Sequence, residues 1–303
     1  MWFRNLVVYR VPARWDLSSE RLAEMLAPQA FVPGSAIDEV VTGWAPPIAD
    51  DESLVATVHG QHLLSLRQEK KLLPARVISQ FVRQRIEKIE QTEGYKPGRK
   101  QAKEIKEEVR DELLPRAFSL ASDTAVWIDP RNGWLAIDTG SAGRAEEIFS
   151  LLARAIEKFP ARPLKLPRPI AEVLTEWLLA GDAPDGFTID QDAALSARQG
   201  KASIRYANDD LPAEEVARHI EAGKLCTRLA MTWADRISFV LTDKFEIKRI
   251  KPLEILSDES GQAEGDDARA RFEADAMLMT RELAALLDAL VQACGGEQIA
   301  QAA

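Results

Sequence analysis

The sequence of 303 residues contains only two cysteines and three histidines, the side chains on which disulfide frameworks and most zinc sites depend. With Cys226 and Cys294 alone, neither a disulfide framework nor a thiolate metal site is expected. His59 and His62 lie three apart in strand-like sequence, which turns them to opposite faces of a strand. The sequence therefore predicts no metal and no cofactor.

Long apolar runs are also absent. No stretch approaches the roughly 18 to 20 uninterrupted apolar residues that a membrane helix needs. Met1 to Asn5 leads directly into a strand-like run, without the basic region or small-residue cleavage site of a signal peptide. We therefore expect a soluble, cytoplasmic protein with no membrane partner.

The common catalytic motifs are missing, because no Walker loop, GxGxxG, GxSxG or HExxH occurs. One enzyme-like trace is Asp235 followed by Glu246 and Lys248, the order in which metal-dependent nucleases place two Mg²⁺-binding carboxylates and a lysine that steadies the attacking water. So short a match arises easily by chance, and turns favour aspartate at a position such as 235. A Mg²⁺-dependent nuclease is thus the alternative to a protein without catalytic activity.

Charge is distributed unevenly along the chain. The net charge is −9, yet residues 252–303 hold 3 basic and 11 acidic residues, whereas 67–116 hold 14 basic and 9 acidic ones. The chain before residue 252 is close to neutral and carries its positive charge in blocks. Such a chain can bind a polyanion, because contacts depend on local potential more than on the total charge.

The most basic block, residues 67–116, has the pattern of two helices. Apolar residues recur at three- and four-residue spacing along the first helix and form a narrower stripe on the second, which begins near Arg99. These residues are Val77, Ile78, Phe81, Val82, Ile86 and Ile89, then Ala102, Ile105, Val109 and Leu113. Gly94 to Gly98 has turn composition. We predict a protruding helical hairpin, for which an ordinary solvated charged surface is the simpler interpretation.

The remaining segments predict an α+β fold with antiparallel sheets covered by helices. Hairpins are expected at 53–67 and, around Asn132 and Gly133, at 124–139. Helices are expected at 142–159, 170–179 and 213–222, with short strands at 187–189 and 202–206. A proline-rich connector at 160–169 suggests a subdomain boundary.

Residues 224–251 read as a three-stranded antiparallel meander. Alternation turns Leu225, Leu229, Met231 and Trp233 inward and Lys224, Cys226, Arg228 and Thr232 outward. Arg236 and Lys248 are also expected on the open face, with Arg249 near a strand end and Glu246 as the one acid. This basic bias fits phosphate contact, and an ordinary solvated sheet face is the alternative.

After Pro252 the chain becomes acidic and rich in small residues. Beyond it, a helix is expected from the four- and three-residue spacing of Phe272, Ala276, Met279, Leu283, Leu286 and Leu290, which should dock on the body or on another chain. We divide the sequence into a central region (1–73 with 116–168), an arm (74–115), a base (169–256) and an acidic linker with a terminal helix (257–303).

Phe118 follows the arm directly, in Pro115-Arg116-Ala117-Phe118. An aromatic at such a position usually belongs to a core. The alternative is an anchor that enters a pocket on a partner subunit.

Several of these stretches together resemble the RdgC family of recombination-associated proteins of proteobacteria. The resemblance runs from Met1 to about Leu256 and rests on motifs that occur in order: Met1-Trp2-Phe3-Arg4-Asn5-Leu6, Gly43-Trp44 with Pro46-Pro47, Leu113-Leu114-Pro115-Arg116-Ala117-Phe118-Ser119, Leu174-Thr175-Glu176-Trp177 and His219-Ile220-Glu221-Ala222-Gly223-Lys224. It implies horseshoe-shaped subunits that pair into a ring, encircle double-stranded DNA without sequence preference and limit RecA-driven strand exchange, without catalysis.

The resemblance also implies roles for parts of this chain. The arm would form the tip that closes the ring, with Phe118 at the tip contact of the homodimer, and basic residues would line the hole. Our candidates for DNA contact are Arg67, Lys71, Arg116, Lys224, Arg228, Arg236, Lys248 and Arg249. Residues 207–210 depart from the family, whose loop there can be basic, since Ala207-Asn208-Asp209-Asp210 is neutral to acidic. A nucleoid-associated location follows from the same resemblance.

Overall fold

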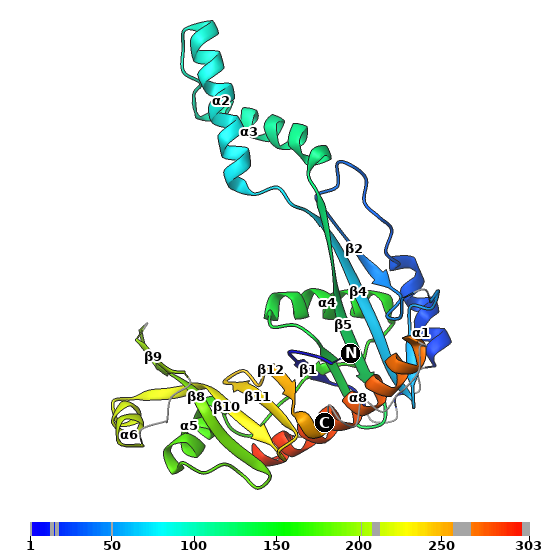
Figure 1. Cartoon of the computed structure of the whole chain (residues 1–303), viewed down its shortest axis with the longest axis vertical. Coiled ribbons are helices and arrows are strands. Elements are labelled where there is room, and N and C mark those ends of the chain that lie inside the picture. Colours follow the sequence, from blue (N-terminus) through cyan, green and yellow to red (C-terminus); the bar gives the residue numbers. More distant parts are fainter. Residues whose placement is uncertain are drawn as a thin grey trace. The chain divides into compact units, whose positions relative to one another are not determined.

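The computed structural model describes residues 2–12, 15, 18–49, 51–200, 202–207, 213–256 and 268–298. The chain divides into two compact units, one formed by residues 1–25, 46–64 and 125–303 and the other by residues 26–45 and 65–124. Figure 1 labels their elements. The four-part division drawn from the sequence is finer than these two units and stays a prediction.

Antiparallel pairing dominates, and the α+β class predicted from the sequence is confirmed. One sheet has the strand order β2-β4-β5-β6-β1-β7, with β3 paired to β4. Its strands are β1 (Val7–Arg10), β2 (Val40–Ala45), β3 (Ala56–Val58), β4 (Gln61–Lys71), β5 (Ser119–Asp129), β6 (Trp134–Ile137) and β7 (Arg162–Pro163). Both predicted hairpins are present, β3–β4 around Gly60 and β5–β6 around Gly133, two glycines with positive φ.

The second sheet lies wholly in the first unit and has the order β12-β11-β10-β8-β9. Its strands are β8 (Phe187–Ala197), β9 (Ser203–Tyr206), β10 (Lys224–Trp233), β11 (Ile237–Thr242) and β12 (Ile247–Pro252). The predicted meander is confirmed as β10–β11–β12. The strand expected at 187–189 is much longer, because β8 continues through the polar run Asp190-Gln191-Asp192 to Ala197.

Helices complete both units. The first unit contains α4 (Ala142–Ala155), α5 (Ile170–Ala180), α6 (Ala213–Glu221), α8 (Ala268–Ala293) and most of α1 (Ser19–Leu26). The second contains α2 (Ala75–Glu93), α3 (Arg99–Leu113) and the short 3₁₀ turns η1 (Ala27–Gln29) and η2 (Leu114–Arg116). Within the described residues, no helix is long and apolar enough to cross a membrane.

The core of the first unit is one continuous apolar cluster to which α8 contributes along its length. Met279, Leu283, Leu286 and Leu290 of this helix are fully buried, together with Phe239 of β11. Figure 1 shows α8 running along β11 and β12. The predicted terminal helix is therefore confirmed, and it docks on the body of its own chain.

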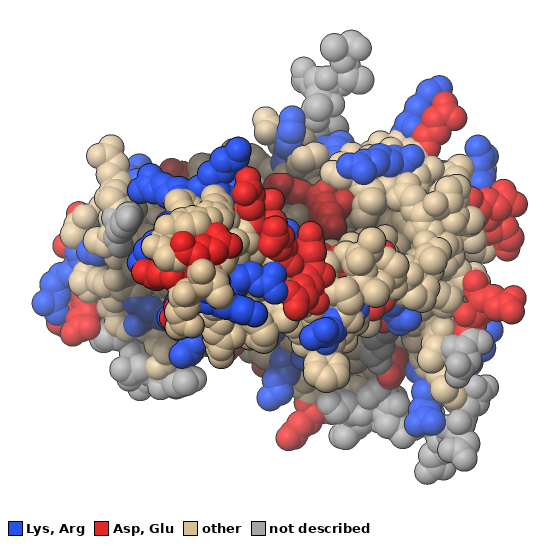
Figure 2. Space-filling view, turned by 90° about the horizontal axis from the view of Figure 1, so that it is seen from above, with Lys and Arg blue, Asp and Glu red and all other residues tan. Residues whose placement is uncertain are grey.

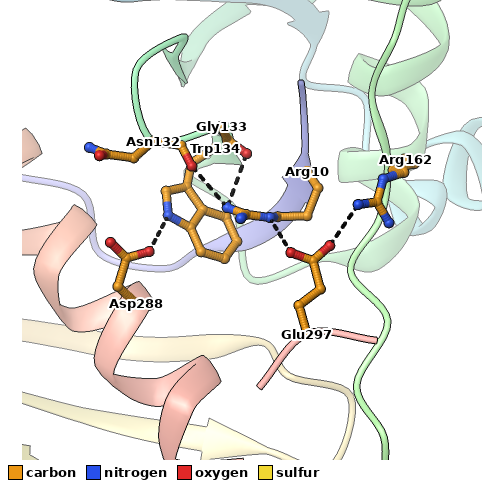
Figure 3. A network of polar contacts seen from close by, with 7 residues as sticks. All are labelled: Arg10, Asn132, Gly133, Trp134, Arg162, Asp288 and Glu297. Atoms are coloured by element: carbon orange, nitrogen blue, oxygen red, sulfur yellow. Dashed lines mark hydrogen bonds and ion pairs between the residues drawn. The ribbon is translucent and has the colours of Figure 1, made fainter. Parts of the chain in front are cut away.

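A polar network fixes the end of this helix to the first sheet (Figure 3). The guanidinium of Arg10 lies 3.9 Å from the ring centroid of Trp134, donates to Glu297 at 2.9 Å and reaches two backbone carbonyls of the β5–β6 turn. Arg162 donates to the other oxygen of Glu297 at 2.8 Å, and Trp134 Nε1 donates to Asp288 at 3.0 Å. Both acceptors belong to α8 or the residues just after it.

The predicted helical hairpin is confirmed in the second unit. Gly94 ends α2 with φ of 74°, a left-handed conformation that glycine adopts at little cost. Ile78 of α2 packs against Ile105 and Val109 of α3. Phe81 was expected on this apolar face, but 43% of it is exposed, because the narrow stripe of α3 covers only part of α2.

Candidate nucleic-acid interface

The second sheet buries one face and leaves the other open. Ala193, Leu195, Leu229, Met231, Phe239 and Leu241 point into the core. On the open face, Ala194 pairs with Arg228 of β10 and with Arg205 of β9, so these three side chains stand in one row. A neighbouring row joins Ala230, Val240 and Lys248. The register thus gathers basic residues from β9, β10 and β12.

A cleft of about 190 Å³ crosses this open face. Its lining includes Arg205, Arg228, Lys248 and Arg249, together with Asn5. The sheet spans four interstrand spacings, roughly 19 Å in all. The cleft is smaller than the roughly 300 Å³ or more of typical ligand pockets and lies on an open sheet face, so it suits a charged group of a larger anionic surface more than a small enclosed ligand.

Arg249 is aimed by an irregularity of β12. Its φ of 54° is left-handed, and the pairing of β11 with β12 shifts between Ser238 and Val240. The Arg249 backbone N–H donates to Asn5 Oδ1 at 3.3 Å, and its guanidinium donates to Asp192 at 3.3 Å. Because Asp192 is on the open face, this ion pair also neutralises an acid beside the cleft.

Lys248 is held at the cleft by two contacts. Its Nζ lies 2.8 Å from Glu246 and donates to the carbonyl of Gly140 at 3.1 Å. Its side chain is 20% exposed. Lys248 therefore contributes little free positive charge, whereas Arg205 and Arg228 are exposed and have no acidic partner within the described part of the chain.

Two candidates do not lie at this cleft, which corrects their predicted place on the open face. Arg236 precedes β11 in a turn and donates to both oxygens of Glu282 in α8, at 2.8 and 3.0 Å. Its side chain is thus directed to the helix side of the sheet. Lys224 lines another groove, with Glu172 and Glu176 of α5.

Cys226 was also expected outward and is fully buried. The pairing of β10 with β8 shifts between Cys226 and Arg228, leaving Thr227 as an extra residue. Such a bulge reverses the alternation. Cys226 consequently points into the core, where its backbone N–H donates to the hydroxyl of Thr175 at 2.8 Å.

The remaining basic candidates belong to the second unit. Arg67 donates two hydrogen bonds to Asp123, at 2.8 and 2.7 Å, and this contact raises the pKa of the guanidinium. Lys71 at the end of β4 and Arg116 in η2 have no acidic partner within the residues that the structure covers. Lys71 and Arg116 are therefore the uncompensated cations of this set.

On the hairpin itself, some of the basic residues are paired with acids. Arg85 bridges to Glu112 at 2.8 Å and to Glu108 at 3.9 Å, and Arg110 pairs with Glu39. Figure 2 shows Lys and Arg intermixed with Asp and Glu on the visible face. The basic surplus of 67–116 is thus dispersed over a surface of both signs.

Phe118 is the most exposed large apolar residue among those described, at 83%. It follows η2 and accepts a hydrogen bond from the backbone N–H of Leu72 through its own carbonyl, at 2.7 Å. Leu72 and Leu120 are also more than half exposed. The interpretation of Phe118 as a core residue is therefore wrong, and the side chain is accessible in the isolated chain.

The nuclease residues are not brought together. Asp235 lies in the turn before β11, whereas Glu246 follows that strand, so the length of β11 separates them by roughly 20 Å. Glu246 is paired with Lys248. No group of three or more potential metal ligands occurs in the described ranges. The Mg²⁺ site suggested by Asp235 and Glu246 is contradicted by this geometry.

Sequence reasoning missed Arg205. Residues 202–206 were expected to be a strand, but nothing local indicated that it pairs with β8, since Asp190-Gln191-Asp192 interrupts the apolar pattern. The only available signal was the alternation within 202–206, which turns Arg205 to the face opposite that of Ile204.

Comparison with known proteins gives one consistent result. Residues 1–297 match the family model described as "Putative exonuclease, RdgC". The chain is 50% identical over 300 residues to the recombination-associated protein RdgC of Herminiimonas arsenicoxydans, covering 98% of this chain and 99% of that protein. It is 50% identical to the protein of the same name from Janthinobacterium sp. (strain Marseille), with the same coverage, and 49% identical to that of Burkholderia cenocepacia, covering 98% and 97%.

Proposed function

Because the chain belongs to the RdgC family of recombination-associated proteins, we propose that it binds double-stranded DNA without sequence preference and limits RecA-mediated recombination and replication-fork processing. It would do so in the cytoplasm, associated with the nucleoid, and without catalysing a reaction on the DNA. The recombination-associated names of its relatives are one support for this proposal.

The observation that carries the proposal is the open face of the second sheet. Arg205 and Arg228 have no acidic partner in the described chain, and Arg249 is 62% exposed beside them. Arginines on a broad sheet face can contact phosphates, which are the same in every DNA sequence. Among the described elements, we find no recognition helix and no zinc finger next to these arginines that would read the bases.

The proposal includes a homodimer shaped as a ring of two horseshoe subunits. Phe118 supports it, because its ring is 83% exposed and its neighbours Leu72 and Leu120 are also more than half exposed, and neighbouring exposed apolar side chains indicate an interaction surface. The hairpin of α2 and α3, next to Phe118 along the chain, would then close the ring. A low-resolution image of the particle tests this: a closed ring is expected, and a solid body would contradict it.

DNA binding is tested by measuring the affinity for two unrelated duplexes of equal length over a series of salt concentrations. We expect equal affinities and a logarithm of the association constant that falls linearly with the logarithm of salt, by about 0.9 for each phosphate contacted. A salt-insensitive or strongly sequence-selective isotherm contradicts the proposal. A scaffold that binds only protein would give no DNA complex even at low salt.

The effect on recombination needs a separate assay. In a strand-exchange reaction driven by RecA, addition of the protein is expected to lower the yield of exchanged product. The Arg205→Ala/Arg228→Ala variant should lower this yield less than the native protein does, because the variant binds the duplex less tightly. Full inhibition by a variant that no longer binds DNA would show that inhibition does not depend on the duplex.

A further inference from the structure

We propose that Arg205 and Arg228 form a discrete site that holds one phosphate group of the DNA backbone between them, above Ala194. This inference rests on the proposed function for its ligand. It goes further by assigning a two-arginine clamp where the proposed function needs only a positive surface.

The backbone register places the two arginines as a pair. Both face Ala194, one from β9 and one from β10, so their Cα atoms are about 10 Å apart across β8. Their side chains rise on the same face. A guanidinium on its long stem can lean toward the middle of such a gap, and the methyl group of Ala194 leaves the space between the two stems open.

Two acids beside the site are each paired with a cation. Asp192 accepts from Arg249 at 3.3 Å, and Glu246 lies 2.8 Å from Lys248. Asp190, further along β8, keeps its charge and accepts from the hydroxyl of Thr232. Because the two ion pairs cancel, the charge left at the row of Ala194 itself is that of Arg205 and Arg228.

Two facing guanidinium groups suit a phosphate better than a carboxylate. Each guanidinium presents a planar fork of donors that matches two oxygens of an anion. A carboxylate has two oxygens in one plane and is satisfied by a single fork. A phosphodiester is tetrahedral, and its non-bridging oxygens can accept from both sides. Since the group is the same in every nucleotide, the contact carries no sequence information.

Binding of the bare group can be measured on the full chain without DNA. We would label alanine amides with ¹⁵N and titrate inorganic phosphate, expecting the Ala194 signal to shift in a saturable way. Arg205→Ala/Arg228→Ala should abolish the shift, whereas Arg131→Ala, an exposed arginine in the β5–β6 turn, should leave it unchanged. A shift that survives in the double variant overturns the site.

Salt dependence on DNA distinguishes one shared phosphate from two separate ones. For a shared phosphate, the slope of log affinity against log salt should fall by about 0.9 for each subunit that contacts the DNA, or about 1.8 for the homodimer, in the double variant, and the losses in the single variants should not add. Two independent contacts in each subunit would lower the slope by about 3.6 for the homodimer with additive losses, which overturns the clamp.

The source of the phosphate is tested with two duplexes. We expect the same loss on covalently closed circular DNA and on a linear duplex with 5′-phosphates, because the clamp takes internal phosphates. A loss confined to the linear duplex would overturn this assignment. If the native protein binds DNA and the double variant shows the same salt slope as the native protein, the clamp is wrong and the proposed function stands. If inorganic phosphate shifts the Ala194 signal but the protein binds no duplex, the phosphate site stands and the proposed function is wrong.

Discussion

Arg236 and Glu282 form a two-point ion pair that joins the turn before β11 to α8, with donor–acceptor distances of 2.8 and 3.0 Å. Only 8% of the Glu282 side chain is exposed. Arg281 also lies 3.1 Å from the same carboxylate. The pair therefore fastens the second sheet to the helix that closes its core.

We expect Arg236→Ala to lower the free energy of unfolding by roughly 2 to 3 kcal/mol, because a nearly buried carboxylate then keeps only Arg281. Urea unfolding measures this loss. Arg228→Ala is the matched control, expected to change stability by less than about 0.5 kcal/mol since Arg228 is exposed. The effects on DNA affinity should be the opposite: Arg228→Ala should bind DNA more weakly than Arg236→Ala does. Equal stability of the two variants would contradict the role of the ion pair.

Phe118→Ala should weaken self-association at least about tenfold while leaving the monomer's unfolding midpoint unchanged, because the side chain packs little against its own chain. Sedimentation velocity over a dilution series measures the dissociation constant. Met277→Ala, which removes a 43% exposed side chain from α8 in the first unit, is the control. If both variants dimerise like the native protein, Phe118 is not an interface residue.

The pH dependence of stability should contain a contribution from Asp138. Burial raises the pKa of this carboxyl, although its Oδ1 accepts from the backbone N–H groups of Arg4 and Asn5. The native state then binds the proton more tightly than the unfolded state, so this contribution to stability falls as the pH rises from the ordinary carboxyl value, about 3.9, through the raised pKa.

Asp138→Asn keeps an oxygen that can accept both hydrogen bonds and removes the titration. Measured by urea unfolding, the stability of the variant relative to the native protein should rise between about pH 4 and pH 7. A difference that stays constant over this range would show that Asp138 does not titrate differently in the two states.

Both thiols should be inert in the folded protein. Burial raises the pKa of Cys226 and of Cys294 to about 12, so the reactive thiolate is negligible near neutral pH. We expect no alkylation by iodoacetamide in native buffer and two adducts after unfolding, read by mass spectrometry. Fast labelling of the native chain would mean that α8, which precedes Cys294 directly, opens frequently.

Incubation of plasmid DNA with the protein and Mg²⁺ should give no cleavage, because the length of β11 separates Asp235 from Glu246. Gel electrophoresis detects nicked or linear products. Cleavage by the native protein that is lost in Glu246→Ala would restore the nuclease interpretation, and cleavage that persists in that variant would point to a contaminating enzyme.

Local patterns were sufficient for much of this fold. Apolar spacing and the turn at Gly94 predicted the hairpin of α2 and α3, and alternation predicted the meander of β10 to β12. The failures have non-local causes. One extra residue after Cys226 reverses the side chains of β10, and Glu282, 46 residues away, draws Arg236 to the helix side of the sheet.

The candidate site was predicted less completely for the same reason. Arg228 and Lys248 do lie on the expected open face, because Arg228 follows the bulge of β10 and Lys248 precedes the irregularity at Arg249, so local alternation still decides their direction. Arg205 was missed, since its relation to Arg228 exists only through their common neighbour Ala194. Pairing between strands separated by a helix cannot be read from either strand alone.

The place of α8 in the chain has a consequence for biosynthesis. It is the last of the described elements to leave the ribosome, yet Met279, Leu283 and Leu290 complete the core beneath sheet strands made earlier. Until it arrives, those strands present an uncovered apolar face, the kind of surface on which nascent chains aggregate or recruit chaperones. Premature termination near residue 256 should therefore yield an insoluble fragment, and not a shortened working protein.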